Sequence, residues 1–248
     1  MPLMSHHAIV CEIKKQISKY KLQNFNHNES PQAGKTVVAL FEMHHDPVPN
    51  FLVQFISSLI KPDTIAIEQP IEYTTFLEKM RTDQAGNTLE EDDDPYLKSL
   101  QELTTMVSCP LVCIDAPDKI RSQENLDEAA LDNLRNTFMA LSLIYFLPGH
   151  TSLTINGLAH RKDFSDQLSQ LDKKITMIPI EYHIDQRINK ASAIMEKDGV
   201  SVVIKISTPN IRSLKDPDFC QRLSSLLERF YPKPQLIYSS SSTFFANM

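Results

Sequence analysis

The sequence predicts an α/β protein built around a central, mostly parallel sheet with helices on both faces. Short apolar runs alternate along most of the chain with longer segments whose apolar residues recur at helical spacing. This alternation is typical of parallel sheets, because parallel strands are joined through crossover helices. The 248 residues, 42% of them hydrophobic, contain no linker and no internal repeat, which favours one domain.

The chain is expected to begin with an amphipathic helix over residues 7–20. Ile9, Ile13 and Ile17 recur at nearly helical spacing, and lysines lie elsewhere around the helix. We interpret this helix as docked on the domain, and binding to an acidic membrane surface is the alternative. With the Asn-rich loop that follows, residues 1–33 precede a single α/β domain over residues 34–238, and the Ser-rich residues 239–248 form a tail.

The first half of the domain alternates regularly between strands and helices. A strand at 37–41 is followed by a helix at 49–60, which begins with proline, a favourable residue in a first helical turn. The next elements are expected to be a strand at 65–67, helices at 72–80 and 95–107, and a strand at 111–114. The acidic residues 90–94 lack the alternating spacing of a calcium-binding loop and indicate a solvated loop.

The second half begins with a long helix at 125–146, where leucine and phenylalanine side chains form an apolar stripe. Apolar residues alternate between Val200 and Ile206, as in a strand with one buried face. The other expected elements are strands at 152–155, 175–180 and 235–238, and helices at 162–171 and 218–230.

The composition argues against several classes of function. The net charge of −6, without a long basic tract, argues against a nucleic-acid partner. None of the 5 glycines belongs to a Gly-rich phosphate loop. No apolar segment approaches the ~20 residues of a transmembrane helix, and polar residues such as His6, His7 and Glu12 interrupt any signal-peptide core. A cytoplasmic protein is therefore expected, with a secreted effector as the alternative.

The cysteines support a reducing compartment. Cys109 and Cys113 flank a short strand that separates them by roughly 13 Å, too far for a disulfide. We expect all 4 cysteines to be reduced thiols.

Acidic and imidazole side chains follow three of the predicted strands at the point where each ends. Glu42 and His44 follow the first strand and, two residues apart, project from the same side. Glu68 follows the second strand, which is expected to neighbour the first, and His160 follows a later strand after Gly157, whose backbone freedom permits a tight turn. In open α/β sheets ligands bind at this edge, so one shared site is expected. Two carboxylates and two imidazoles suit either a divalent metal or metal-free acid–base catalysis.

Four more residues are weaker candidates for ligand binding. His45 adjoins His44 but faces the opposite side of an extended strand. Asp115 ends the strand at 111–114, and Glu181 and His183 follow the strand at 175–180. These side chains either contribute to the site or are capping and surface groups.

Arg135 lies close to the apolar stripe of the long predicted helix. It either extends to water or pairs with a buried acid, and contact with Glu42 or Glu68 would hold that carboxylate ionised. No serine nucleophile stands in a nucleophile-elbow motif, and Cys113 is interpreted as a core thiol.

Four short motifs in residues 36–160 resemble a known superfamily. They are Phe41-Glu42-Met43-His44, Glu68, Arg135-Asn136-Thr137-Phe138-Met139-Ala140 and Gly157-Leu158-Ala159-His160. Their order is similar to that of the group joining ChaN-like iron-regulated lipoproteins, erythromycin esterase-like proteins and Tiki/TraB/GumN proteins, which also includes a domain of the Pasteurella mitogenic toxin. Phe41 stands where that group has glycine. The resemblance implies an α/β fold and a site made of Glu42, His44, Glu68, Arg135 and His160.

The resemblance leaves three functions open. The first hypothesis is a hydrolase of an ester or amide bond acting on a small-molecule or peptide substrate, with Glu42, His44 and His160 as ligands if manganese, zinc or cobalt binds. The second is a binding protein for haem, iron or a small ligand, with a tyrosine or histidine such as Tyr73, Tyr182, His183 or His45 as ligand. The third is a bacterial effector or toxin-like module that binds a protein partner.

Overall fold

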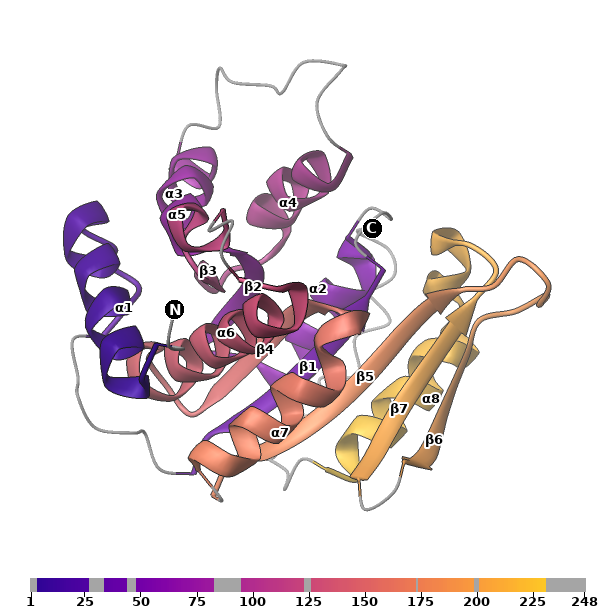
Figure 1. Cartoon of the computed structure of the whole chain (residues 1–248). Coiled ribbons are helices and arrows are strands. Elements are labelled where there is room, and N and C mark those ends of the chain that lie inside the picture. The colour runs from indigo at the N-terminus through magenta and orange to yellow at the C-terminus, as the bar shows by residue number, and fades with distance from the viewer. Residues whose placement is uncertain are drawn as a thin grey trace.

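A single twisted sheet of seven strands, in the order β3-β2-β4-β1-β5-β7-β6, forms the centre of the protein (Figure 1). The fold is taken from a computed structural model that describes residues 4–26, 34–43, 48–82, 95–122, 126–172, 174–198 and 201–230. Neighbouring strands are parallel except β6 and β7, which pair antiparallel. The strands are β1 Thr36–Glu42, β2 Thr64–Pro70, β3 Leu111–Asp115, β4 Thr151–Gly157, β5 Thr176–Ile184, β6 Ser192–Asp198 and β7 Ser201–Thr208.

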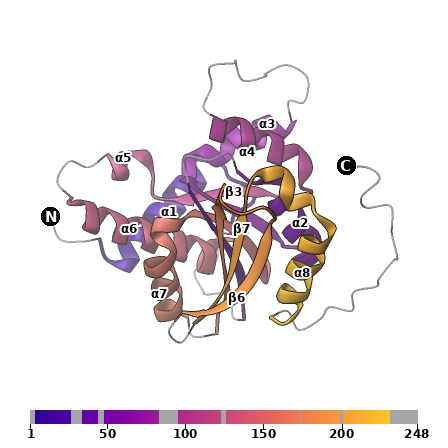
Figure 2. The same ribbon diagram turned by 90° about the vertical axis from the view of Figure 1, so that its right-hand side faces the viewer.

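Helices cover both faces of the sheet, which confirms the predicted fold class (Figures 1 and 2). The α-helices are α1 His6–Tyr20, α2 Asn50–Ile60, α3 Thr74–Thr82, α4 Pro95–Met106, α5 Asp118–Arg121, α6 Glu128–Leu141, α7 Arg161–Leu171 and α8 Pro217–Glu228. Short helical turns are η1 Ile71–Tyr73, the π-helical η2 Ser142–Phe146, η3 Leu158–His160 and η4 Ile211–Lys215.

Two apolar cores result from the alternation of side chains along the strands. Val37, Ala39 and Phe41 of β1 face α1, α6 and α7, whereas Val38 and Leu40 face α2 and α4. We call these the α6 side and the α2 side of the sheet. The central strands are buried on both sides, which explains their continuous apolar sequences.

The chain leaves adjacent strands of the sheet in opposite directions. After β1 it enters α2 on one side, and after β4 it enters α7 on the other. Strands β1 and β4 are neighbours, so their carboxyl ends form a topological switch point, where open α/β sheets bind ligands. The expectation that β1 and β2 are neighbours is wrong, because β4 lies between them.

Several elements differ from the sequence prediction. The predicted helix at 125–146 is divided into α6 and the π-helical η2, and β5 extends to Ile184, so Glu181 and His183 lie within it. Strand β6 was not predicted, since its exposed side is polar and its apolar residues are few. The predicted strand at 235–238 and the tail lie outside the described residues.

The N-terminal helix packs against the domain, as one of the two interpretations predicts. Ile9, Ile13 and Ile17 are buried beside Phe138 and Leu141 of α6. Cys11, Cys109, Cys113 and Cys220 are all free thiols. In the described part of the chain, no helix has the length and apolar character required to cross a bilayer.

Candidate functional site

Four of the five neighbouring strands from β3 to β5 carry an acidic residue at the carboxyl edge of the sheet. Asp115 ends β3, Glu68 lies near the end of β2, Glu42 ends β1 and Glu181 lies in β5 opposite Phe41. In place of an acid, β4 presents Gly157, which pairs with Glu42. This edge includes the switch point between β1 and β4.

Glu68 is the centre of a buried hydrogen-bond network. Its Oε1 accepts from Arg135 Nη2 at 2.5 Å and lies 3.0 Å from His160 Nε2, and its Oε2 accepts from the Gly157 N–H at 2.7 Å. The carboxylate side chain has no exposed surface. Gly157 has an ordinary φ of −64°, so its predicted tight-turn role is wrong, and its contribution is this N–H.

Arg135 joins two carboxylates from different strands. Its Nε and Nη2 donate to Asp115 Oδ2 at 2.9 and 2.8 Å, while Nη2 also donates to Glu68. Asp115 Oδ1 accepts from the Ala116 N–H at 2.6 Å. The predicted pairing of Arg135 with a buried acid is therefore confirmed for Glu68, and Asp115 belongs to the same network. Burial raises the pKa of the Asp115 carboxyl, and Arg135 opposes that shift.

His160 lies between an acid and an amide. Its Nε2 faces Glu68 and its Nδ1 is 3.1 Å from Asn136 Oδ1, which can only accept a hydrogen bond. Burial lowers the pKa of the imidazole, but the hydrogen bond and charge of Glu68 outweigh it, so the pKa is raised overall. Acceptors on both sides of the ring stabilise the doubly protonated imidazolium relative to the neutral ring, in agreement with the raised pKa.

Glu42 and Phe41 are adjacent in β1, so their side chains lie on opposite sides of the sheet, with Phe41 on the α6 side. Glu42 is 1% exposed and shares the α2 side with Val38 and Leu40. Tyr96 of α4 is nearby: burial, followed by the charges of Glu42 and Glu68, raises the pKa of its hydroxyl well above the ordinary value. The structure thus brings together Glu68, Asp115, Arg135 and His160, with Glu42 on the opposite face of the same edge.

Two residues of this region were missed as site residues. Asn136 occurs in the helix motif quoted above, and its position next to Arg135 was the available signal. Tyr96 lies on an amphipathic helix among core residues, where helical spacing alone does not distinguish a site tyrosine from a packing one.

Glu181 and His183 belong to a separate cluster. Glu181 Oε1 accepts from Arg161 Nε at 2.7 Å, and its Oε2 lies 4.0 Å from His183 Nε2 and from Lys205 Nζ. Arg161 also pairs with Asp198 of β6. These two candidates therefore belong to an ion-pair cluster with Arg161 and Lys205, beside the network of Glu68.

The predicted metal set is incomplete in the described residues. His44 and His45 lie outside them, so their positions stay predictions. Elsewhere in the described chain, no three His, Cys, Asp or Glu side chains are close enough to hold a metal ion. Both ring nitrogens of His160 and both oxygens of Glu68 have hydrogen-bond contacts, so these two residues as arranged do not present a metal-binding face.

Phe41 packs normally in the position where the resembled superfamily has glycine. Its ring meets Phe164 of α7 edge-on, with 6.4 Å between centroids, and the side chain is fully buried. The backbone φ angle of Phe41 is not positive, so the residue does not adopt the left-handed conformation that favours glycine. Nothing at this position of the backbone requires glycine, and the phenylalanine anchors α7, the helix that follows His160.

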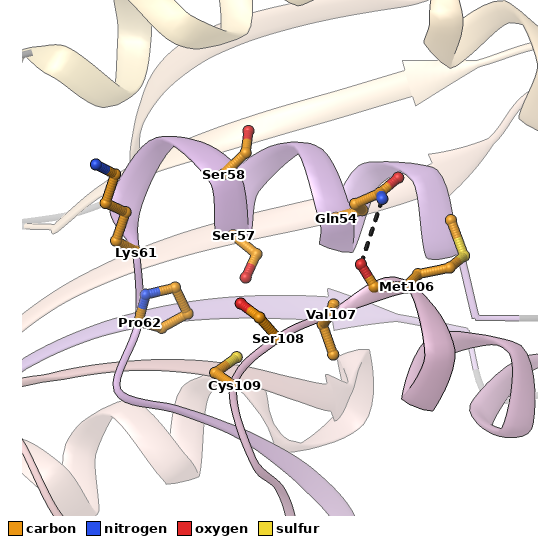
Figure 3. Close-up of a pocket in the computed structure, with 9 residues that line it drawn as sticks. All are labelled: Gln54, Ser57, Ser58, Lys61, Pro62, Met106, Val107, Ser108 and Cys109. Atoms are coloured by element: carbon orange, nitrogen blue, oxygen red, sulfur yellow. Dashed lines mark hydrogen bonds between the residues drawn. The ribbon is translucent and has the colours of Figure 1, made fainter. Parts of the chain in front are cut away.

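The pocket drawn in Figure 3 lies at the opposite edge of the sheet. It has a volume of about 460 Å³ and is lined by the C-terminal half of α2 and the segment that enters β3. Ser57, Ser108 and Cys109 point toward one another there, and Gln54 Nε2 donates to the Met106 carbonyl (Figure 3). The pocket contains none of the predicted site residues.

In comparisons with known proteins, no family model, no curated protein and no solved structure matches the chain. The resemblance inferred from the four motifs therefore stays a prediction.

Proposed function

We propose that the protein hydrolyses an ester or amide bond in a small molecule or peptide, with His160 as the residue that transfers the proton. The observation that supports this is the contact of His160 with both Glu68 and Asn136, at a switch point of the sheet. A carboxylate on one imidazole nitrogen is the arrangement that orients a catalytic histidine and stabilises its imidazolium form.

Arg135 and Gly157 would serve as supports for this pair. They keep Glu68 ionised and fixed, so that Glu68 in turn holds the ring of His160. The nitrogen for proton transfer would be Nδ1, which donates to the neutral Asn136 amide in the resting arrangement. A substrate atom would replace the Asn136 amide as the partner of Nδ1, while the stronger, charged contact between Nε2 and Glu68 would remain.

Glu42 would take the proton from the attacking water. Glu42 is the last residue of β1 and pairs with Gly157 on the neighbouring strand β4. His160 follows Gly157 by three residues along the chain. The water oxygen would attack the carbonyl carbon as Glu42 accepts its proton, and His160 would donate the Nδ1 proton to the departing oxygen or nitrogen. The raised pKa of His160 suits the role of proton donor.

The test is turnover of a panel of nitrophenyl esters and chromogenic peptides by wild type and by His160→Gln. Loss of a proton-transfer residue is expected to lower kcat by roughly 100-fold or more. His150→Gln is the control, because this histidine is exposed at the amino end of β4. Circular dichroism would verify folding, and unchanged turnover in His160→Gln would refute the assignment.

Metal dependence is tested separately. Elemental analysis of protein purified without a His tag would detect manganese, zinc or cobalt, and none of the steps above passes through a metal. If a metal is bound stoichiometrically, it should be lost in His44→Ala, the predicted ligand outside the described residues.

A further inference from the structure

A row of polar side chains crosses the α6 side of the sheet between the two edges. We call it the polar seam. On β4 it consists of Ser152, Thr154 and Asn156. Asn156 contacts Met139 of α6, and Asn136 and Ser142, three residues before and after Met139, complete the seam from α6 and the start of η2. The three β4 residues pair with Val37, Ala39 and Phe41 of β1, so they point into what is otherwise an apolar core.

The seam is fully buried, and some of its polar atoms lack a hydrogen bond to any described residue. This applies to one atom on each side chain: Ser152 Oγ, Thr154 Oγ1, Asn156 Oδ1, Asn136 Nδ2 and Ser142 Oγ. All five residues are at most 1% exposed. Across the seam, Asn156 Nδ2 lies 3.8 Å from Met139 Sδ, and a thioether sulfur is only a weak hydrogen-bond acceptor.

The spacing of the seam prevents its members from satisfying one another along the strand. Alternate residues on a strand are roughly 6.6 Å apart, whereas a hydroxyl hydrogen bond spans about 2.8 Å. Buried polar groups are paired with protein or with ordered water in the great majority of native structures. Five unsatisfied groups in one row are an exception to this rule, and a ligand between them would satisfy them.

Each end of the seam adjoins a buried ionisable group. At the carboxyl edge, Asn136 Oδ1 contacts His160 Nδ1. At the amino edge, Lys35 immediately precedes β1, is fully buried, and donates from Nζ to the Leu147 carbonyl at 2.9 Å, just beyond η2. The π-helical turn η2 lies over this end, and such turns occur often at functional sites.

We infer that the polar seam binds a row of internal water molecules that links the His160 site to Lys35. Water suits the seam because hydroxyls and amides need a partner that both donates and accepts hydrogen bonds. An ion does not suit it, since the middle of the seam has no charged side chain. The row would connect Asn136, whose amide oxygen contacts His160 Nδ1, with the other end of the sheet through hydrogen bonds, and the inference does not depend on the hydrolase proposal.

A crystal structure at a resolution that shows ordered water is the direct test. Water within hydrogen-bond distance of Thr154 Oγ1 and Asn156 Oδ1 is the expected result. Side chains that instead rotate to bond backbone carbonyls, with no water between them, would overturn the inference.

The second test is the thermal stability of Thr154→Val, which replaces the hydroxyl by a methyl group of similar size. If water binds this hydroxyl, the substitution removes satisfied hydrogen bonds, and Tm should fall by on the order of 2–4 °C. The matched control is Thr74→Val, because the buried Thr74 Oγ1 accepts from the Cys113 N–H at 2.9 Å. In a dry seam the valine would relieve an unsatisfied hydroxyl, so an unchanged or higher Tm for Thr154→Val argues against bound water.

Discussion

Arg135 determines whether two buried carboxylates can coexist at the site. Glu68 and Asp115 come from adjacent strands and have no exposed side-chain surface, so without a counter-charge they would repel each other in a poorly solvated environment. One guanidinium satisfies both because its donors are arranged in a planar fork. A lysine would offer a single point charge and would not reproduce these contacts.

Arg135→Met is expected to lower the free energy of unfolding by about 3–5 kcal/mol, because two buried carboxylates lose the guanidinium that they share. Glu68 then keeps His160, and Asp115 keeps the longer contact with Arg121, at 3.8 Å. Urea unfolding followed by circular dichroism measures the change. Arg187→Met is the matched control: Arg187 pairs with Asp185 on the surface, so its loss should change stability little. Equal stability of Arg135→Met and wild type would contradict the assigned role.

The protonation of His160 should make stability depend on pH. Its folded-state pKa is raised above the ordinary 6.5, with burial opposing and Glu68 dominating. The resulting stabilisation is complete below pH 6.5 and is lost as pH rises through the folded pKa. Relative to His160→Gln, wild type should therefore lose stability across that range, and an NMR titration of the ring should report the raised pKa. A ring titrating below 6.5 would contradict the network described above.

The turn into β4 is fixed by one carboxylate, that of Asp63. Asp63 Oδ2 accepts from the backbone N–H groups of His150 and Thr151, at 2.8 and 2.9 Å. Gly149 approaches this side chain so closely that a Cβ would lie 2.1 Å from Asp63 Cγ. The turn therefore requires glycine both for its positive φ of 82° and for space.

Gly149→Ala is expected to destabilise the protein much more than Gly34→Ala. Both glycines have positive φ, but a Cβ at Gly34 meets nothing within 4 Å. Gly34→Ala should cost only the conformational penalty, about 1–2 kcal/mol, and Gly149→Ala should cost roughly 3 kcal/mol or more. Thermal unfolding of the two variants gives the comparison, and equal losses would show that Asp63 moves aside.

Hydrophobic spacing was sufficient to predict the buried elements but not their arrangement. The strands at 37–41, 65–67, 111–114 and 152–155 and the helices between them were found because each buries a continuous face or stripe. Strand β6 escaped because one of its sides is solvated, although Asp198-Gly199 before an alternating strand was an available hairpin signal. The position of β4 between β1 and β2 depends on long-range packing, which local spacing does not encode.

For the site, too, local sequence features were predictable and long-range arrangements were not. Strand ends carrying Glu68 and His160 were recognisable, and the contact of Arg135 with Glu68 followed from an arginine placed beside an apolar stripe. The sequence did not show that Glu181 and His183 belong to a different cluster from Glu68. That arrangement depends on the extension of β5 to Ile184 and on the ion pair between Arg161 and Glu181. Tyr96 reaches the acids from a helix distant in sequence, with no local signal.

Lys35 gives the stability of the protein a pH dependence opposite in sign to that of His160. Burial lowers the pKa of its ammonium group from 10.5 to about 8. Between these values the folded lysine has lost its proton while the unfolded one retains it, so stability should increase with pH, by up to about 3 kcal/mol.

Unfolding of wild type and Lys35→Met between pH 7.5 and pH 10.5 tests this expectation, with the window set by the two pKa values above. The increase should be absent in Lys35→Met and present in Lys119→Met, whose lysine is exposed. Parallel curves for wild type and Lys35→Met would show that the buried amine titrates normally.

The charges on β6 have a consequence for self-association. This strand is the last in the described sheet, and strand edges with unpaired N–H and C=O groups can recruit strands from other molecules into aggregates. The end of β6 is a continuous run of charged residues, Glu196, Lys197 and Asp198. Their burial beneath a strand from another molecule would be unfavourable. The charged residues that made β6 hard to predict from local hydrophobicity thus also protect the edge of the sheet, because they disfavour the addition of further strands in a fibril.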